Sequence, residues 1–300
     1  MISVHISNEN IQVVYGDAKF GLFNIHEYYK APTPEGAIIN GVITDFDALR
    51  EDIGVLWKQN KISSKGISLV IDSSPVVGKV MRVPYVSQKK IMKFVRRELA
   101  PQDDDVILDY SVISVSEDIK KKDKKNYGID IYACSVQRHL LQSYVDLFES
   151  KGIKLSSINL SINSVIKLGH FLRSLKDKTY IIIVLDGNSL ASFLFINGKF
   201  SISNKYRLTY ERGTSPSYME IIQHVSTLMQ FTSTQRSDQK IENAYFCGLY
   251  KDEEIICRQI NMDLGIGARI FPHNEPEIFV HQKAKGFILS ENIYVSGNLI

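Results

Sequence analysis

The sequence predicts an α/β protein made of two similar lobes, and two observations carry that prediction. A strand–turn–strand pattern at residues 2–20 returns at residues 181–200. Segments with strand periodicity also alternate with amphipathic helical segments along both halves of the chain. With 300 residues, 44% of them hydrophobic, the chain is long enough for two cores. An ungapped shift superposes Ile2 on Ile182, Val4 on Val184, Asn8 on Asn188, Lys19 on Lys199 and Phe20 on Phe200.

Composition excludes several classes of protein. The 36 basic and 33 acidic residues give a net charge of +3, too balanced for a nucleic-acid surface. Cys134, Cys247 and Cys257 are scattered, which argues against a disulfide framework or a zinc site. A strand directly after Met1 leaves no room for a signal peptide, and no apolar run approaches the roughly 18 residues of a membrane span. We therefore expect a cytoplasmic protein whose link to a membrane runs through a partner.

The first lobe begins with a hairpin. Residues 2–6 and 11–15 alternate in polarity and predict two strands joined by the polar turn 7–10. After a segment rich in proline and glycine, residues 46–58 have the spacing of an amphipathic helix. Strands are predicted at 66–74 and 77–84.

A change of character at Pro84 predicts an inserted α+β subdomain at residues 85–154. Ser87 is placed to cap a basic helix, QKKIMKFVRREL. The lysine-rich run 117–128 is an alternative membrane or nucleic-acid contact, but its acidic neighbours favour a solvated hairpin tip. Further elements are predicted at 106–115 (strand), 128–136 (strand), 137–151 (helix) and 154–159 (strand). The first lobe would then consist of residues 1–84 and 155–177.

The second lobe is predicted at residues 178–300. After a helix near 161–175, the repeated hairpin is followed by strands and helices in the order of the first lobe. The tail after Pro276 shows no periodicity and predicts irregular structure. The other predicted elements are strands at 180–185, 199–208, 241–247 and 266–271 and helices at 217–233 and 251–262.

Four ordered blocks of sequence carry a resemblance to a known family. They are PEGAIINGVITDFDALREDI (34–53), KVMRVPYVSQKKIMKFVRREL (79–99), MEIIQHVSTLMQFTSTQRSDQKIENAYFCG (219–248) and GLYKDEEIICRQINMDLGIGARIF (248–271). In this order they resemble the PilM family of type IV pilus assembly proteins and, more distantly, the cell-division protein FtsA. A weaker resemblance is to the cytoplasmic domain of the type II secretion L protein, which continues into a transmembrane helix that this sequence lacks.

The PilM resemblance implies both a fold and a function. It implies a duplicated actin-like (ribonuclease H-like) two-lobed fold with nucleotide between the lobes and a subdomain inserted in lobe one. It also implies a cytoplasmic scaffold at the inner face of the membrane, holding the N-terminal tail of a PilN-like membrane protein in a groove beside the insertion. Pilus motor or platform proteins are further implied partners. The residues of the groove cannot be read from the sequence.

The nucleotide site implied by the resemblance is degenerate in this sequence. The family's phosphate hairpins carry Asp-x-Gly, where the carboxylates serve the metal and attacking water and the glycine admits phosphate. The ungapped register puts His5 and Ser7 at these positions in the first hairpin, and Leu185 and Gly187 in the second. His5 is either a phosphate contact or, more typically of a lone histidine, structural. Asp186 comes one residue late, and alternation along a strand sends it to the opposite face, which favours an ordinary turn.

Two further departures weaken the site. At the place of the family's Gly-Gly pair this sequence has Gly248-Leu249, which keeps only the first glycine. The subdomain expected after the second hairpin is reduced to residues 202–218. Lys205 and Arg212 lie in this short polar segment, and we expect both to be solvated. We therefore predict a non-catalytic scaffold without catalytic or metal-binding residues or a required cofactor. An active actin-like ATPase that uses ATP with Mg²⁺ is the alternative. The residues left to bind nucleotide would be Ser7, Asn8, Asn10, Gly187, Asn188, Ser189 and Gly248.

No other catalytic or metal-binding motif competes with this interpretation. The sequence contains no GxxxxGK[ST], GxSxG or HExxH. Asp109 and the run DDD at 103–105 could form a cation cluster, but adjacent carboxylates before a strand are more typical of a solvated turn.

Overall fold

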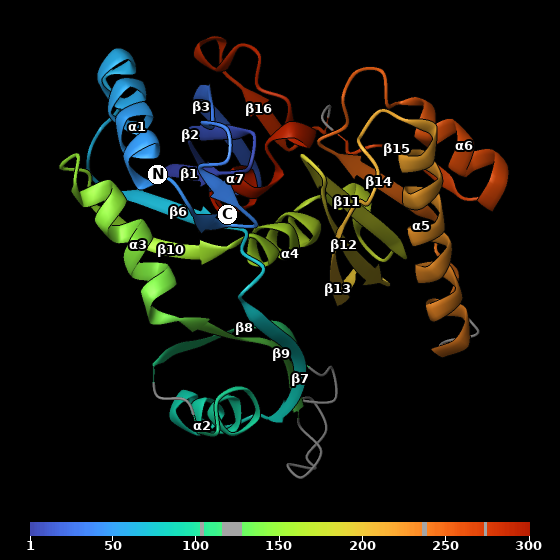
Figure 1. The fold of residues 1–300 in the computed structure, drawn as a ribbon. Helices are drawn as coiled ribbons and strands as arrows, with labels where there is room; N and C mark the ends of the chain where they lie inside the picture. Colours follow the sequence, from blue (N-terminus) through green and yellow to red (C-terminus); the bar gives the residue numbers. More distant parts are fainter. Residues whose placement is uncertain (103–104, 116–127, 236–238, 273–274) are drawn as a thin grey trace.

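The computed structural model describes residues 1–102, 105–115, 128–235, 239–272 and 275–300. They form two lobes side by side, with a smaller subdomain projecting from the first lobe (Figure 1). The lysine-rich run at 117–127 and the aspartates at 103–104 lie outside the described residues, so the predictions made for them stay untested. Among the described helices, none is long and apolar enough to cross a membrane.

The first lobe is built on a six-stranded sheet. Strands β1, β2 and β3 are antiparallel, β6 pairs in parallel with β1, and β10 pairs in parallel with β6. Helices α1 and α3 lie against each other through Trp57 and Phe148, whose ring centroids are 5.8 Å apart. In sheet order the strands are β10 (Leu155–Leu160), β6 (Ile67–Ile71), β1 (Ile2–Ile6), β2 (Asn10–Lys19), β3 (Leu22–Pro32) and β16 (Ile278–Val280). The helices of this lobe are α1 (Phe46–Asn60), α3 (Arg138–Glu149), α4 (Ser161–Phe171) and α7 (Ile293–Gly297), and β4 (Ile38–Ile39) pairs with β5 (Val42–Ile43).

The second lobe repeats the first in topology. Three antiparallel strands are again followed by two parallel ones, so the duplication predicted from the repeated hairpins is present in the fold. A separate hydrophobic core lies between this sheet and its two long helices. The sheet order is β13 (Lys199–Arg207), β12 (Ser189–Ile196), β11 (Tyr180–Asp186), β14 (Asn243–Cys247) and β15 (Gly267–Ile270), and the helices are α5 (Ser215–Gln235) and α6 (Ile255–Leu264).

The ungapped register between the two hairpins is wrong toward their ends. The turn between β2 and β3 is formed by Phe20 and Gly21, whereas the turn between β12 and β13 is formed by Asn197 and Gly198. Phe20 therefore lies fully exposed at a turn, while Phe200, its partner in the ungapped shift, is buried in β13. The strand β2 is longer than β12, which an ungapped comparison cannot accommodate.

The inserted subdomain has different boundaries from those predicted. Strand β7 (Val77–Pro84), which we placed in the first lobe, pairs along its whole length with β9 (Gly128–Gln137), and β8 (Val106–Val115) pairs with the other edge of β9. Helix α2 (Gln88–Leu99) covers this small sheet. Helix α3, which we placed in the insertion, buries Tyr144 and Leu147 in the first-lobe core. The inserted subdomain thus begins with β7 and ends with β9, because these strands pair with each other while α3 packs into the core of the first lobe.

The chain end returns to the first lobe, contrary to the prediction that residues 178–300 form the second. Strand β16 pairs in parallel with β3, and α7 packs against α4 (Figure 1). The tail is ordered by buried hydrogen bonds: the Asn298 amide donates to the hydroxyls of Ser3 and Ser68, at 2.8 and 3.0 Å. The described residues also form three short 3-10 helices, at Arg173–Leu175, Gln282–Ala284 and Leu289–Glu291.

Candidate functional site

Two cavities lie between the lobes, where both hairpins end. One measures about 150 Å³ and the other about 290 Å³. Both are lined by His5 and Ser7 of the first lobe and by Asp186 of the second. This is the place where the resemblance implied a nucleotide.

The backbone N–H groups of the first turn are already hydrogen-bonded within the protein. The Ser7 N–H donates to the Asn10 carbonyl at 2.9 Å. The N–H groups of Glu9 and Asn10 both donate to the Ser7 hydroxyl, at 3.2 and 3.0 Å. The Asn8 N–H donates to the Asp186 carboxylate at 2.9 Å. A phosphate at this turn would have to displace one of these bonds, because each N–H is a single donor.

Asp186 faces the cleft, which corrects the prediction that its carboxylate points away from the site. Leu185, not Asp186, is directed into the second-lobe core, so alternation along β11 turns Asp186 toward the first lobe. Besides the backbone bond, its carboxylate accepts a hydrogen bond from the Asn8 amide at 2.8 Å. Burial raises the pKa of Asp186 above its usual value. Asp186 and His5 line the same two cavities, so a carboxylate of the second lobe lies in the cleft beside this histidine.

His5 is buried beside this carboxylate. Its ring meets Tyr294 edge-on at 5.1 Å, and its Nε2 has no hydrogen-bond partner among the residues described. Burial lowers the pKa of His5, against the opposing charges of Asp186 and Asp72. The neutral imidazole is therefore the favoured form.

Asp72 is a cleft residue that the sequence interpretation missed. It directly follows β6 and forms an ion pair with Lys205 of β13, at 2.8 Å, and its carboxylate also accepts from the Ser161 hydroxyl. Burial by itself would raise the pKa of Asp72. The charge of Lys205 and the hydrogen bonds to the carboxylate have the larger combined effect, so the pKa of Asp72 lies below its usual value. The sequence does contain a signal for this residue: Asp72 stands at the carboxyl end of a buried strand, β6, which runs parallel to β1. Lys205, predicted to be solvated, instead joins the two lobes.

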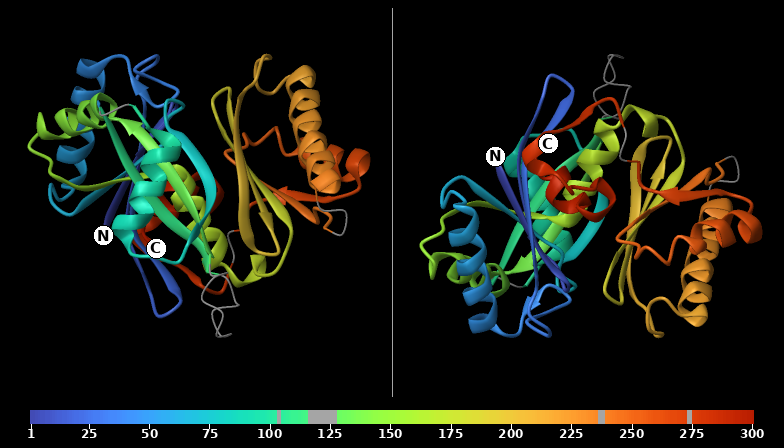
Figure 2. Two further views of the ribbon diagram at one scale, coloured as in Figure 1. Left: turned by 90° about the horizontal axis from the view of Figure 1, so that it is seen from below. Right: turned by 90° about the horizontal axis from the view of Figure 1, so that it is seen from above.

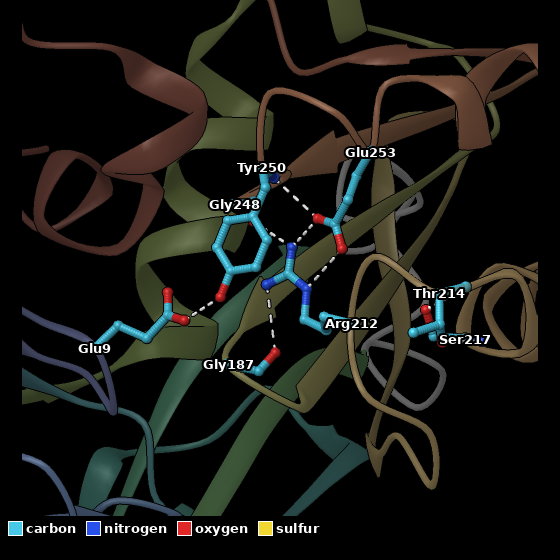
Figure 3. A network of polar contacts seen from close by, with 8 residues as sticks. All are labelled: Glu9, Gly187, Arg212, Thr214, Ser217, Gly248, Tyr250 and Glu253. Carbon is cyan, nitrogen blue, oxygen red and sulfur yellow. Dashed lines mark hydrogen bonds and ion pairs between the residues drawn. The ribbon is translucent and has the colours of Figure 1, made fainter.

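Arg212 is the centre of a buried network and is not solvated as predicted (Figure 3). Its side chain is 3% exposed and forms an ion pair with Glu253, which is fully buried. The guanidinium also donates to the carbonyls of Gly187, at 3.3 Å, and Gly248, at 2.9 Å. One arginine thus fixes both glycines that we had assigned to nucleotide.

An aromatic ring extends this network to the first lobe. The Arg212 guanidinium lies 3.9 Å from the centre of the Tyr250 ring, and the Tyr250 hydroxyl donates to the Glu9 carboxylate (Figure 3). Burial raises the pKa of Tyr250 to about 12, so it stays a donor at neutral pH. Tyr250 and Glu9 therefore connect the second lobe to the turn of the first hairpin.

The remaining predicted residues are also held by the protein itself. The Gly248 N–H donates to the Ser290 carbonyl at 3.0 Å, and a Cβ on Gly248 would lie 2.1 Å from the Leu185 carbonyl oxygen. Close packing against β11 is thus sufficient reason for this glycine. The Asn188 carbonyl accepts from the Leu208 N–H at 2.8 Å, and the Ser189 hydroxyl donates to the Asn40 side chain at 3.4 Å.

No metal centre is found in the described part of the chain. No three His, Cys, Asp or Glu side chains there come together in a group that could hold an ion. In the cleft, Asp72 is paired with a lysine and Asp186 with an asparagine.

A separate cavity lies where the inserted subdomain meets the first lobe. It measures about 90 Å³ and is lined by residues of β8, β9, α3, β10 and α4. Strands β8 and β10 are each at the edge of their sheet, and both contribute to its walls. The Ser111 hydroxyl donates to the Asn163 side chain at 2.8 Å across it. We call this cavity the insertion groove; its lining includes Ile107, Tyr110, Ser111, Ile158 and Asn163.

Comparison with solved structures defines the class of protein. The fold is similar to that of the protein in a PilM–PilN type IV pilus biogenesis complex, with a TM-score of 0.79 and 13% identity over 99% of this chain and 96% of that chain. It is also similar to a Bacteroides thetaiotaomicron protein with an actin-like ATPase fold and unknown function, with a TM-score of 0.52 and 10% identity over 99% and 94% of the chains. The duplicated sheets and the cleft between them are those of an actin-like fold, as predicted.

The family follows from the sequence. The model of the family described as type IV pilus assembly protein PilM matches residues 3–177, more than half of the chain. The chain therefore belongs to the PilM family of type IV pilus assembly proteins. No curated protein matches the sequence.

Proposed function

We propose that this protein is a scaffold of the type IV pilus inner-membrane assembly complex, which binds the cytoplasmic N-terminal tail of a PilN-like membrane protein. Membership of the PilM family is the observation that carries the proposal, and similarity to the protein of a PilM–PilN complex supports it. The protein would then reside in the cytoplasm, at the inner face of the membrane, because its partner is anchored there. Pilus motor or platform proteins would be further partners.

The insertion groove is the site that we propose for the tail. Edge strands β8 and β10 both border it, and an edge strand offers unpaired backbone groups to an extended peptide. Apolar side chains such as Ile107 and Ile158 can receive alternate side chains of that peptide, while Ser111 and Asn163 supply polar contacts. The groove also matches the position, beside the insertion, that the family resemblance implied.

We further propose that the cleft acts without nucleotide and that the protein is not an ATPase. Hydrogen bonds inside the protein already use the N–H groups of the first turn. Arg212 donates hydrogen bonds to the carbonyls of Gly187 and Gly248 in the second lobe. Phosphoryl transfer needs positioned metal ions, and the two aspartates of the cleft, Asp72 and Asp186, are engaged with Lys205 and Asn8. An active ATPase is the competing function. The observation that favours it is Asp186, whose carboxylate lies in the cleft.

Titration calorimetry with the synthetic tail peptide of the cognate PilN-like protein tests the scaffold function. We expect saturable binding whose affinity does not change when ATP and Mg²⁺ are added. Ile107→Glu places a charge in the groove and should weaken binding at least about tenfold, since an unpaired charge at a desolvated contact costs more than 1.4 kcal/mol.

Val112→Glu is the matched control. Val112 is on the same strand, is 51% exposed against 36% for Ile107, and lies outside the groove lining. Its variant should bind the tail like the wild type. Absence of binding to the folded wild-type protein would refute the scaffold function. Equal affinity in both variants would refute only the placement of the tail.

A further inference from the structure

Helix α2 carries more net positive charge than any other helix in the described part of the chain. Its 12 residues include five basic side chains and one acidic, a net charge of +4, while the whole chain has +3. Every other described helix has a net charge of at most one unit. Apart from α2, the chain is therefore close to neutral. The helix's charged residues are Lys89, Lys90, Lys93, Arg96, Arg97 and Glu98.

The charged face of α2 points away from the molecule. Ile91 and Val95 are buried against the small sheet, while all five basic residues are exposed. Helix α2 forms the far side of the inserted subdomain, away from both lobes (Figure 1), and lies in front of its sheet when the molecule is seen from below (Figure 2, left). We define the basic face by Lys89, Lys90 and Lys93, and nothing in the described part of the chain buries these three side chains.

Neither ion pairing nor helix stability accounts for these three lysines. Glu98 pairs with Lys79 and Arg97 at the other end of the helix, and no acidic group of the described residues forms an ion pair with Lys89, Lys90 or Lys93. They occupy the first half of α2, and its first turn contains no acidic residue. Cations near a helix N-terminus oppose the helix dipole, so this arrangement costs stability locally. The stability of the helix therefore does not explain the two lysines of its first turn, Lys89 and Lys90.

We propose that the basic face of α2 contacts anionic lipid headgroups at the cytoplasmic surface of the membrane. Lysines are flexible point charges that suit a fluid layer of phosphates without fixed geometry. Tyr85, 66% exposed directly before the helix, has an amphipathic ring suited to the headgroup region. The location rests in part on the proposed function, because a tail held in the insertion groove brings the same subdomain close to the membrane.

The lipid contact and the tail would act as two anchors for one molecule. A polybasic surface alone gives weak and reversible membrane binding, and a second attachment makes it stable. Once the tail is bound, the lipid contact becomes intramolecular and adds affinity without a new protein contact. It would also orient the cleft and the second lobe relative to the membrane.

Vesicle co-sedimentation of the full-length protein, without any tail, tests the lipid contact. We expect binding to phosphatidylcholine vesicles that contain phosphatidylglycerol and none to phosphatidylcholine alone. Binding should vanish in 1 M salt, where the screening length is about 3 Å. Replacing the three lysines (Lys89→Gln, Lys90→Gln and Lys93→Gln together) should weaken it on the order of 100-fold, from the contribution of each basic residue at such a surface.

The matched control removes the same charge from another face. Lys58, Lys65 and Lys154 are exposed on the first lobe, and their combined replacement by Gln should leave vesicle binding unchanged. Calorimetry with the tail peptide should give wild-type affinity for both triple variants, so failure of the lipid contact is separable from failure of the scaffold function. The proposal is overturned if the wild type ignores anionic vesicles, or if both triple variants lose binding equally. Binding of an acidic protein or DNA without vesicle binding would also overturn it.

Discussion

At the scale of single residues, His5 links the cleft to pH. The folded protein disfavours the imidazolium because burial lowers the pKa of His5, whereas the unfolded chain takes up a proton near pH 6.5. Unfolding therefore binds a proton as the pH falls below about 6.5, and stability is lost in that direction. Asp186, Asp72 and Lys205 are the charged groups that act on His5.

The prediction is that His5→Gln removes part of the pH dependence of stability. The wild type should lose about 1 kcal/mol of unfolding free energy through this residue between pH 7 and pH 5.5. His170 and His224, whose pKa values burial also lowers, are present in both proteins, so the difference between them isolates His5. Urea denaturation at the two pH values measures it. Parallel losses in both proteins would mean that His5 is protonated in the folded state.

Residues of this cleft show where prediction from sequence ends. The departure of the first hairpin from the family's Asp-x-Gly pattern was visible in the sequence, because His5 and Ser7 stand at the Asp and Gly positions. Asp186 was misplaced, because the direction of a side chain depends on which neighbour enters the core, and Leu185 does. Arg212 looked solvated in a polar stretch, since its partner Glu253 is distant in sequence.

Arg212 yields a second prediction at this scale. Arg212→Met leaves the fully buried Glu253 without its counterion, and breaking such a pair costs about 3–5 kcal/mol. The free energy of unfolding in urea should fall by that amount. The double replacement Arg212→Met with Glu253→Met should lose less, because no buried charge is left unpaired. A single variant as stable as the wild type would show that Glu253 does not depend on the pair.

At the scale of elements, the chain end is the least predictable part of the fold. Its buried side chains include Asn292, Ser296 and Asn298, which interrupt any apolar periodicity. Asn298 is satisfied by partners distant in sequence, Ser3, Ser68 and Asn159, and the sequence does not show such pairing. Elements with regular patterns were predicted well, as for α1, whose Leu49, Ile53, Leu56 and Trp57 are buried.

The stability of the first lobe should accordingly depend on Asn298. Its amide donates to Ser3 and Ser68 and accepts from Asn159, at 2.9 Å. Asn298→Ala strands these polar groups in the interior, at a cost of about 1–3 kcal/mol. Thermal and urea unfolding should show the loss, and Asn204→Ala, on an exposed strand position, should show almost none. Similar stability of the two variants would mean that the tail is not anchored through this side chain.

At the scale of the whole molecule, polar side chains join the two lobes across the cleft. Asp72 pairs with Lys205, Asp186 accepts from Asn8, and Tyr250 donates to Glu9. In a nucleotide-dependent protein of this architecture, phosphate and metal would bridge the two hairpins. Here side chains of one lobe bind the other directly, which is the basis of our proposal that the cleft acts without nucleotide. The duplication was evident from the sequence. The contacts between the lobes could not be predicted from it, because they depend on how the two lobes are placed relative to each other.

The resulting prediction is that ATP with Mg²⁺ does not stabilise the protein. A ligand at 100 times its dissociation constant adds about 2.7 kcal/mol to the free energy of unfolding, which a thermal-shift measurement detects readily. We expect no shift at millimolar ATP, and a clear shift with the tail peptide in the same assay. If ATP does raise the melting temperature, Asp186→Asn decides whether the cleft is responsible. A shift abolished by that variant would establish nucleotide binding beside the Asp186 carboxylate. The contacts between the lobes would then have to open to admit the nucleotide.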